Sequence, residues 1–144
     1  MHGTGLWGAV VAAGVLLLAT LGGLWWRRRD GRLREVAGMA VTGLARYLAG
    51  PVTLVQFSSA QCAPCRAAQR ICAAVAAETD GVRHVELAAE EHLDLVRELG
   101  IWRTPTVLVV DASGTVRHRV SGVPGRAALL GAVELVGSRR TVEV

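Results

Sequence analysis

The 144-residue chain is about one domain long, and its composition, 51% hydrophobic with a mean hydropathy of +0.37, excludes long disorder, collagen-like repeats and a disulfide-dense miniprotein. The formal net charge of +4 is concentrated in residues 27–35, which carry net +3, whereas residues 36–144 carry 11 Arg against 10 acidic residues. A nucleic-acid partner is therefore not expected, because such a partner requires a basic stripe on the folded surface.

The first predicted element is an uncharged run at residues 5–26. As a helix it would extend roughly 33 Å, against about 30 Å of hydrocarbon in a bilayer. Trp7 at one end and Trp25 and Trp26 at the other are typical of membrane interfaces. A cleaved signal peptide fits less well, because no basic segment precedes the run and the sequence WWRRR ends it. We therefore predict a transmembrane helix at 5–26, with membrane lipid as a partner through residues 5–34.

A basic juxtamembrane segment is predicted at residues 27–36. Five Arg lie within residues 27–34, and none precedes the apolar run. Basic residues close to a span favour the cytoplasmic side, where anionic lipids also attract them. We therefore predict a single-pass protein of the cell membrane with its domain on the cytoplasmic face, and the extracytoplasmic face is the alternative.

One soluble domain is predicted at residues 37–137, followed by a C-terminal tail at 138–144. Its expected elements, in chain order, are a helix at 41–49, a strand at 52–57, a helix at 64–78, a strand at 83–88, a helix at 91–99, strands at 106–110 and 116–120, and a last helix from Pro124. The apolar runs VTLVQF and TVLVV are typical of buried strands. This order predicts an α/β fold with a mixed central sheet flanked by helices.

The motif Cys62-Ala63-Pro64-Cys65 lies between a predicted buried strand and the start of a predicted helix. A thiol attacks a disulfide as its thiolate, and a helix N-terminus stabilises a thiolate through partial positive charge and unpaired N–H groups. Cys62, the more N-terminal residue, is therefore the candidate nucleophile, and Cys65 would resolve the mixed disulfide. Pro64 suits the first helical turn, where its missing N–H has no role.

The third cysteine and two histidines leave a metal site open as an alternative. Cys72 lies about 10.5 Å beyond Cys65 along a helix, farther than the ~7 Å limit for a disulfide, and its apolar helix face favours core packing. Zinc would need Cys62, Cys65 and Cys72 together with His84 or His92. We expect no metal and no other cofactor. The Ser and His residues show no spacing that supports a hydrolase triad.

Two segments resemble the thioredoxin superfamily: VTLVQFSSAQCAPCR at residues 52–66 is similar to its active-site segment, and RTPT at residues 103–106 to its cis-proline loop. The resemblance covers residues 37–137 and implies a thioredoxin-like fold. It also implies a thiol–disulfide oxidoreductase that acts on protein thiols and disulfides. By this resemblance Pro105 would be cis, and the Thr104 backbone would face Cys62 and pair with an extended substrate strand.

The chain departs from the usual thioredoxin pattern around the motif. Gln56 stands where many thioredoxins have a buried Asp that assists proton transfer from the resolving cysteine, Gln61 replaces the usual Trp, and Ala63 replaces the usual Gly. Because Gln56 is neither acid nor base, proton transfer would need water or Glu or His groups. Gln61 and Pro64 are expected to support the site. Trp102 either borders the cysteines or covers the core as a rim aromatic.

The sequence thus predicts a membrane-anchored thiol–disulfide oxidoreductase, acting as a reductase or thiol carrier with an unidentified electron donor. An anchor joined to such a domain is also similar to the membrane-tethered thioredoxin-like reductases of cytochrome c maturation, although no extra insertion is found between the motif helix and the next strand. The alternatives are a non-catalytic thioredoxin-fold interaction module and a metal-handling protein that uses the CxxC pair.

Overall fold

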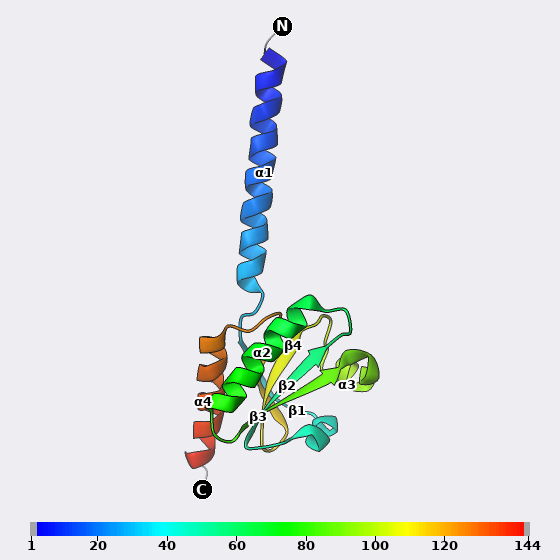
Figure 1. The fold of residues 1–144 in the computed structure, drawn as a ribbon, viewed down its shortest axis with the longest axis vertical. Coiled ribbons are helices and arrows are strands. Elements are labelled where there is room, and N and C mark those ends of the chain that lie inside the picture. Colours follow the sequence, from blue (N-terminus) through cyan, green and yellow to red (C-terminus); the bar gives the residue numbers. More distant parts are fainter. Residues whose placement is uncertain (1–2, 143–144) are drawn as a thin grey trace. The chain divides into compact units, whose positions relative to one another are not determined.

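The computed structural model describes residues 3–142, with side chains described for residues 7–26 and 30–138. The chain divides after Asp30 into two compact units, an N-terminal helix and a folded domain. Figure 1 shows the elements of both units, coloured from blue near the N-terminus to red near the C-terminus.

The N-terminal unit is a single helix, α1 (Gly3–Arg29). It lacks proline and is rich in Ala and Leu, which favour helix. Its stretch Trp7–Trp26 has a mean hydropathy of 2.0, and none of it is buried. By length and composition, α1 is therefore a candidate membrane span, and its stretch Trp7–Trp26 covers most of the predicted run at 5–26.

The domain is built on a five-stranded mixed sheet with the strand order β1-β5-β4-β2-β3. The strands are β1 (Arg34–Ala40), β2 (Val52–Ser58), β3 (Val82–Ala88), β4 (Thr106–Asp111) and β5 (Thr115–Ser121). β2 pairs in parallel with β3, and the other neighbouring pairs are antiparallel. Every residue of β2 is buried, as its nearly continuous apolar run indicates.

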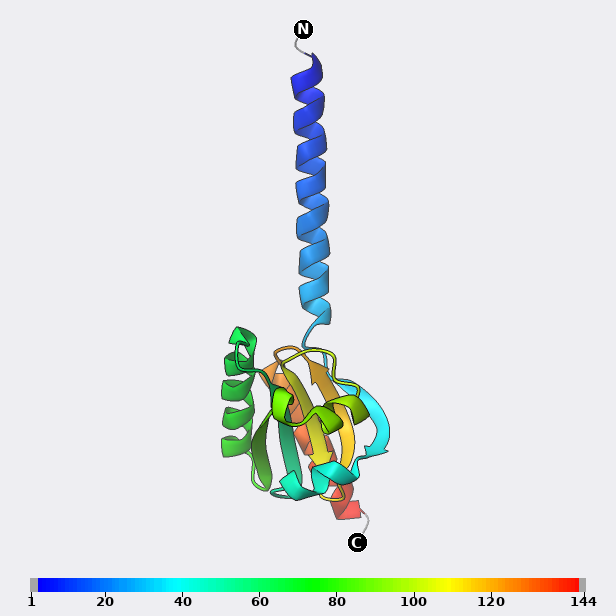
Figure 2. The ribbon, with the colours of Figure 1, turned by 90° about the vertical axis from the view of Figure 1, so that its right-hand side faces the viewer.

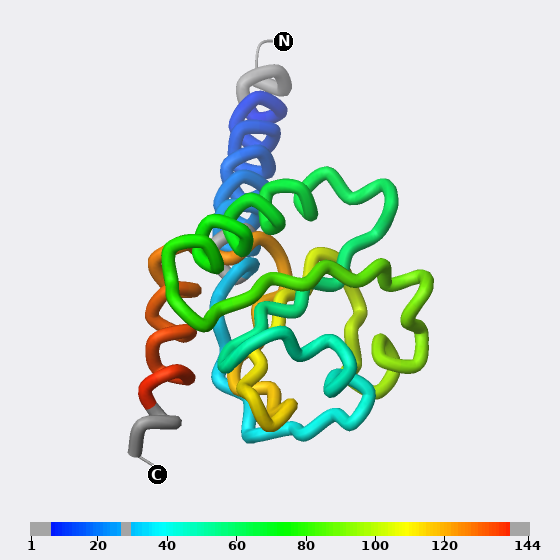
Figure 3. The backbone as a smooth tube through the Cα atoms, turned by 60° about the horizontal axis from the view of Figure 1, so that its bottom comes forward, coloured from blue at the N-terminus to red at the C-terminus, as the bar shows by residue number. Residues whose placement is uncertain are grey.

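Helices cover both faces of this sheet (Figure 2). The helical elements are α2 (Ala63–Glu78), α3 (Leu93–Glu98), α4 (Arg126–Val142) and the short 3-10 helices η1 (Thr42–Tyr47) and η2 (Ala89–Glu91). On one face, α2 and α4 lie side by side (Figure 3). They bury Val75 and Leu129 against Leu54. On the other face, η1 and α3 bury Leu44 and Leu95 with Phe57. The predicted fold class, a mixed sheet between helices, is confirmed.

Alternation along β2 decides which side chains reach the motif helix. Leu54 packs in the α2–α4 core, whereas Val55 and Phe57 pack in the η1–α3 core. Because side chains alternate between the faces of a strand, Gln56 and Ser58 point toward the α2 side. These two buried polar residues therefore lie beneath the start of α2.

Two element boundaries and the type of one helix differ from what the sequence predicts. Residues 34–36, assigned to the juxtamembrane segment, begin the edge strand β1, which shows no apolar alternation because nearly all its residues are exposed. The helix expected at 41–49 is the 3-10 helix η1, in which only Leu44 is buried, so no long apolar face supports an α-helix. At the other end, α4 continues to Val142, into the predicted tail.

Candidate active site

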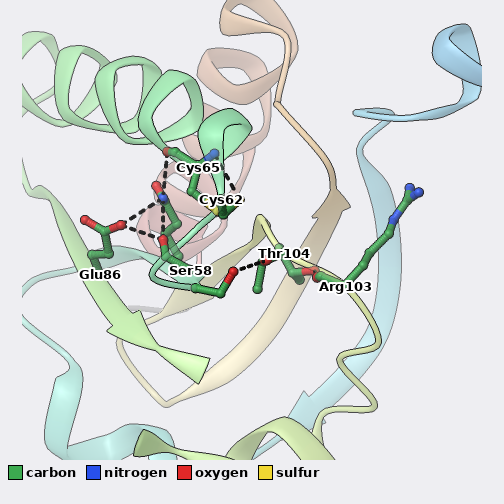
Figure 4. The surroundings of a disulfide bond; sticks show 9 residues. Ser58, Cys62, Cys65, Glu86, Arg103 and Thr104 are labelled. Atoms are coloured by element: carbon green, nitrogen blue, oxygen red, sulfur yellow. Dashed lines mark hydrogen bonds between the residues drawn. A yellow bond between two sulfur atoms is a disulfide. The ribbon is translucent and has the colours of Figure 1, made fainter. Parts of the chain in front are cut away.

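The two motif cysteines are joined in a disulfide at the start of α2, with their Cα atoms 5.3 Å apart (Figure 4). Cys62 is the N-cap residue of α2, and its Sγ accepts a hydrogen bond from the Cys65 N–H at 3.2 Å. Pro64 lies in the first turn, where a missing N–H leaves no broken bond. The same Cys65 N–H that caps the disulfide sulfur, together with the partial positive charge of the helix N-terminus, would stabilise a thiolate on Cys62 after reduction.

The two sulfur-bearing residues differ in access. Cys65 is 3% exposed, whereas Cys62 is only partly buried. An incoming protein sulfur can therefore reach Cys62, while Cys65 is shielded by the domain.

The loop before β4 lies directly beside the motif. The Thr104–Pro105 peptide bond is cis, as the resemblance implies. The hydroxyls of Ser59 and Thr104 are hydrogen-bonded at 2.9 Å, which joins the motif loop to this cis-proline loop (Figure 4). The Pro105 carbonyl accepts a hydrogen bond from the Gly122 N–H at 2.7 Å, so the loop is also fixed to the end of β5.

A half-buried arginine holds the chain that leads into the cis-proline loop. Arg119 on β5 donates from its guanidinium to the carbonyls of Leu99 and Gly100, each at 2.7 Å. Burial lowers the pKa of Arg119, but a guanidinium remains protonated at neutral pH. The loop therefore starts from a fixed point at the end of α3.

Two exposed side chains flank the disulfide region. Trp102 precedes the cis-proline loop, and Gln61 directly precedes Cys62. Trp102 is 93% exposed, so of its two alternatives the one in which it covers the core does not hold. Its position two residues before Thr104 leaves an apolar surface on the loop that borders the disulfide. Arg66 on α2 is likewise exposed to solvent.

A polar cluster lies beneath the first turn of α2, and it comprises Gln56, Ser58, His84 and Glu86. The Gln56 amide nitrogen donates to the Ser58 hydroxyl at 2.8 Å, to the Cys65 carbonyl at 3.0 Å and to a Glu86 carboxylate oxygen at 3.3 Å. The Ser58 hydroxyl donates to the same Glu86 oxygen at 2.5 Å. Because an amide oxygen only accepts, His84 Nε2 donates to Gln56 Oε1 at 3.2 Å.

Sequence reasoning found Gln56 in this cluster but not Glu86, which comes 30 residues later. In the parallel pairing of β2 with β3, Gln56 lies opposite Glu86. The sequence did show polar residues within each of two predicted strands. Only the register between the strands shows that Gln56 and Glu86 lie opposite each other.

The residues of the alternative zinc site do not come together. Cys72 is fully buried in the α2–α4 core, and burial, with a smaller contribution from the Glu86 charge, raises its pKa to about 12. For His84, burial lowers the pKa, and the Glu86 charge opposes this shift. His92 is hydrogen-bonded through Nδ1 to the Ala88 carbonyl. Within the described residues, no three His, Cys, Asp or Glu side chains are grouped to hold a metal ion.

Comparison with known proteins relates this chain to one family. The sequence model of the Thioredoxin family matches residues 45–134. Among solved structures, chloroplastic thioredoxin z is 24% identical with a TM-score of 0.56, covering 67% of this chain and 87% of its own. A mutant thioredoxin from Halobacterium salinarum NRC-1 is 22% identical with a TM-score of 0.55, and the match covers 61% of this chain and 76% of the thioredoxin. Oxidized mitochondrial thioredoxin 3 from Saccharomyces cerevisiae is 20% identical with a TM-score of 0.52, and the match covers 59% of this chain and 78% of the thioredoxin. No curated protein matches the sequence.

Proposed function

Because the chain belongs to the thioredoxin family and carries a CxxC pair at disulfide distance, we propose that it is a membrane-anchored thiol–disulfide oxidoreductase of protein substrates. Cys62 is the nucleophile and Cys65 the resolving cysteine. The observation that supports these roles is the asymmetry of the pair. Cys62 caps the helix and is accessible, whereas Cys65 is 3% exposed.

In the reducing direction, the Cys62 thiolate attacks one sulfur of a substrate disulfide. A Cys62–substrate bond forms, the substrate S–S bond breaks, and the second substrate sulfur leaves as a thiolate with the electron pair. Cys65 then loses its proton and attacks Cys62 Sγ. The Cys62–Cys65 bond forms, the first substrate sulfur leaves, and the domain is oxidised by two electrons.

The cis-proline loop supplies the contact surface for an extended substrate segment. Within residues 30–138, the backbone N–H and C=O of Thr104 have no hydrogen-bond partner. An extended peptide pairs with such groups as an added strand. Thr104 and Pro105 therefore form the main-chain contact, and Trp102 and Gln61 lie at its edges.

The apolar helix α1 is the membrane anchor. Its 20-residue stretch Trp7–Trp26 is unburied in the described chain, and burying its side chains in lipid removes that apolar surface from water. The Arg cluster at residues 27–34 favours the cytoplasmic face for the domain. On that face thiols are kept reduced, so the protein acts as a reductase or thiol carrier.

Trapping of the mixed disulfide tests the assignment of the nucleophile. Full-length Cys65→Ser in detergent, mixed with insulin, should form a covalent adduct at Cys62 that dithiothreitol releases, because no resolving thiol remains. Peptide mass mapping locates the linkage. The matched control is Cys62→Ser, which should form no adduct, since Cys65 is buried. An adduct through Cys65, or no adduct in Cys65→Ser, would reject the proposed roles.

A further inference from the structure

The resolving step, as proposed above, needs a group that removes a proton from a buried thiol. Cys65 is 3% exposed, so bulk water has little access to its side chain. The neighbouring Gln56 is fully buried and cannot take a proton. The chemistry therefore calls for a base on another element that is connected to the start of α2.

Glu86 is the carboxylate that the structure connects to this point. Its oxygen accepts from Ser58 at 2.5 Å and from Gln56 at 3.3 Å, and the same Gln56 nitrogen donates to the Cys65 carbonyl at 3.0 Å. Figure 4 shows Glu86 and Ser58 directed toward each other below the turn that carries Cys65. Gln56 and Ser58 are buried, so these contacts are shielded from competing water.

Glu86 also has a route to solvent. It lies on β3, the edge strand of the sheet, and the residue is exposed although its carboxylate is held by two buried partners. A group in this position can exchange a proton with both the interior and the bulk solvent. A structural ion pair does not explain the arrangement, because no Arg or Lys forms a salt bridge with Glu86 within the described side chains.

We propose that Glu86 is the proton acceptor for Cys65 in the resolving step, and that it acts through the Ser58 hydroxyl. The Cys65 S–H proton passes to this relay, and the relay delivers a proton to Glu86. The freed electron pair of Cys65 forms the bond to Cys62 Sγ, and the substrate sulfur leaves as a thiolate. Glu86 then releases its proton to solvent. Gln56 positions the relay by holding Ser58, Glu86 and the Cys65 backbone together.

The negative charge of Glu86 by itself would slow the resolving step, whereas proton acceptance by Glu86 would accelerate it. The two effects can therefore be distinguished by experiment. A negative carboxylate disfavours a nearby thiolate, as it does at Cys72, so an electrostatic Glu86 would slow Cys65. The titratable groups that interact with the Glu86 charge are His84 on its own strand and Cys72 on α2, and the backbone carbonyl of Cys65 is joined to Glu86 through Gln56. Its other partner element, β2, contributes the neutral Gln56 and Ser58.

The test follows the reaction of reduced full-length protein in detergent with less than one equivalent of 5,5′-dithiobis(2-nitrobenzoate) in a stopped-flow instrument. Attack by Cys62 releases one thionitrobenzoate in a first phase, and attack by Cys65 on the mixed disulfide releases the other in a second phase. Removal of a general base that acts through a relay should slow the second phase of Glu86→Gln about tenfold or more near pH 7. The first phase should be unchanged. The deficit should shrink at alkaline pH, where hydroxide removes the proton.

Three variants separate a proton acceptor from a structural residue. Glu86→Asp, which restores a carboxylate, should recover most of the second-phase rate, and Ser58→Ala should slow only that phase. Glu98→Gln, which removes a similar charge from exposed α3, should change neither phase. An unchanged or faster second phase in Glu86→Gln, equal slowing of both phases, or no recovery in Glu86→Asp would overturn the role of Glu86. Loss of the proposed function itself would appear separately, as a first phase that persists in Cys62→Ser.

Discussion

At the residue scale, the reactivity of three cysteines follows from where each lies relative to α2. Cys62 Sγ already accepts a helix N–H, Cys65 is 3% exposed, and Cys72 is fully buried in the core. Thiolate attack depends on both charge and access. The three thiols should therefore react with an alkylating reagent at very different rates.

Iodoacetamide should modify Cys62 at least about tenfold faster than Cys65 in reduced protein at pH 7. Cys72 should remain unmodified, because a thiol with a pKa of about 12 holds almost no thiolate at that pH. Peptide mapping by mass spectrometry after short exposures measures the three rates. Faster modification at Cys65 or Cys72, with circular dichroism showing a folded domain, would contradict the assignment.

Local motifs predicted some of the site's residues, and strand pairing supplied the others. The order strand, Cys-x-Pro-Cys and helix is read directly along the chain, so the cysteine pair and the Thr104–Pro105 loop were accessible to sequence analysis. Glu86 was not, because its link to Gln56 depends on the parallel register of β2 and β3. Hydrogen-bond partners on two different strands can be identified only when the register between the strands is known. A fully buried strand such as β2 is covered on both faces, so it has no regular alternation of apolar and polar residues that would fix this register.

At the element scale, the turn between β4 and β5 is organised by one carboxylate. Asp111 accepts hydrogen bonds from the N–H groups of Ser113 and Thr115, from the Ser113 hydroxyl at 2.5 Å, and from Arg117 Nε at 2.7 Å. Partial burial alone would raise the pKa of Asp111, but the hydrogen bonds from Ser113, Arg117 and Thr115 outweigh it and hold the pKa below its usual value.

Asp111→Asn should therefore lower the free energy of unfolding by about 1 kcal/mol at pH 7, since the charged acceptor is lost at a partly solvent-screened site. A carboxyl whose pKa is depressed by folding stabilises the fold above its unfolded-state value, near 3.9, and this contribution disappears as pH falls through the folded-state value. Urea titrations at pH 7 and near pH 3 measure the difference from the unsubstituted chain, which should shrink in acid.

Asp80, an exposed acid, provides the comparison for this prediction. Asp80→Asn, in the loop before β3, removes the same charge and should change the free energy of unfolding much less. Equal losses for the two variants, or a loss for Asp111→Asn that does not depend on pH, would show that the turn is not held by the Asp111 carboxylate.

The buried elements were predictable, whereas the exposed edge strand β1 was not. β2, β4, α2 and α4 carry strong apolar patterns and appear near their expected positions. By contrast, β1 is held mainly by antiparallel pairing with β5 and leaves nearly all its side chains in solvent. Edge strands of this kind are specified by backbone pairing with a neighbour, and such pairing leaves no periodic pattern in the sequence.

At the scale of the whole molecule, an apolar helix and a redox domain are carried on one chain. The helix α1 has a stretch of 20 residues suited to a membrane span. For a membrane-anchored domain, the side of the membrane on which it lies determines which thiol pool it meets, because disulfides persist outside the cytoplasm and are reduced within it. Under the proposed anchoring, the orientation of α1 would therefore set the direction in which electrons flow through Cys62 and Cys65.

Reporter fusions after Val144 should show the domain on the cytoplasmic face in a bacterial host, since the Arg residues at 27–34 follow the span. A green fluorescent protein fusion should fluoresce, and an alkaline phosphatase fusion should be inactive. Replacing the Arg residues at 27–34 with Gln should weaken this preference. Phosphatase activity without fluorescence in the unsubstituted chain would place the domain outside and favour a role there.

The most direct test of the account is catalysed reduction of a protein disulfide. Full-length protein in detergent, with dithiothreitol as electron donor, should accelerate insulin reduction and precipitation at catalytic concentration. Cys62→Ser should abolish the acceleration, whereas Cys72→Ala should retain most of it, because Cys72 only fills the core. Acceleration that survives in Cys62→Ser, or no acceleration by the folded unsubstituted chain, would contradict a thiol–disulfide oxidoreductase that works through Cys62.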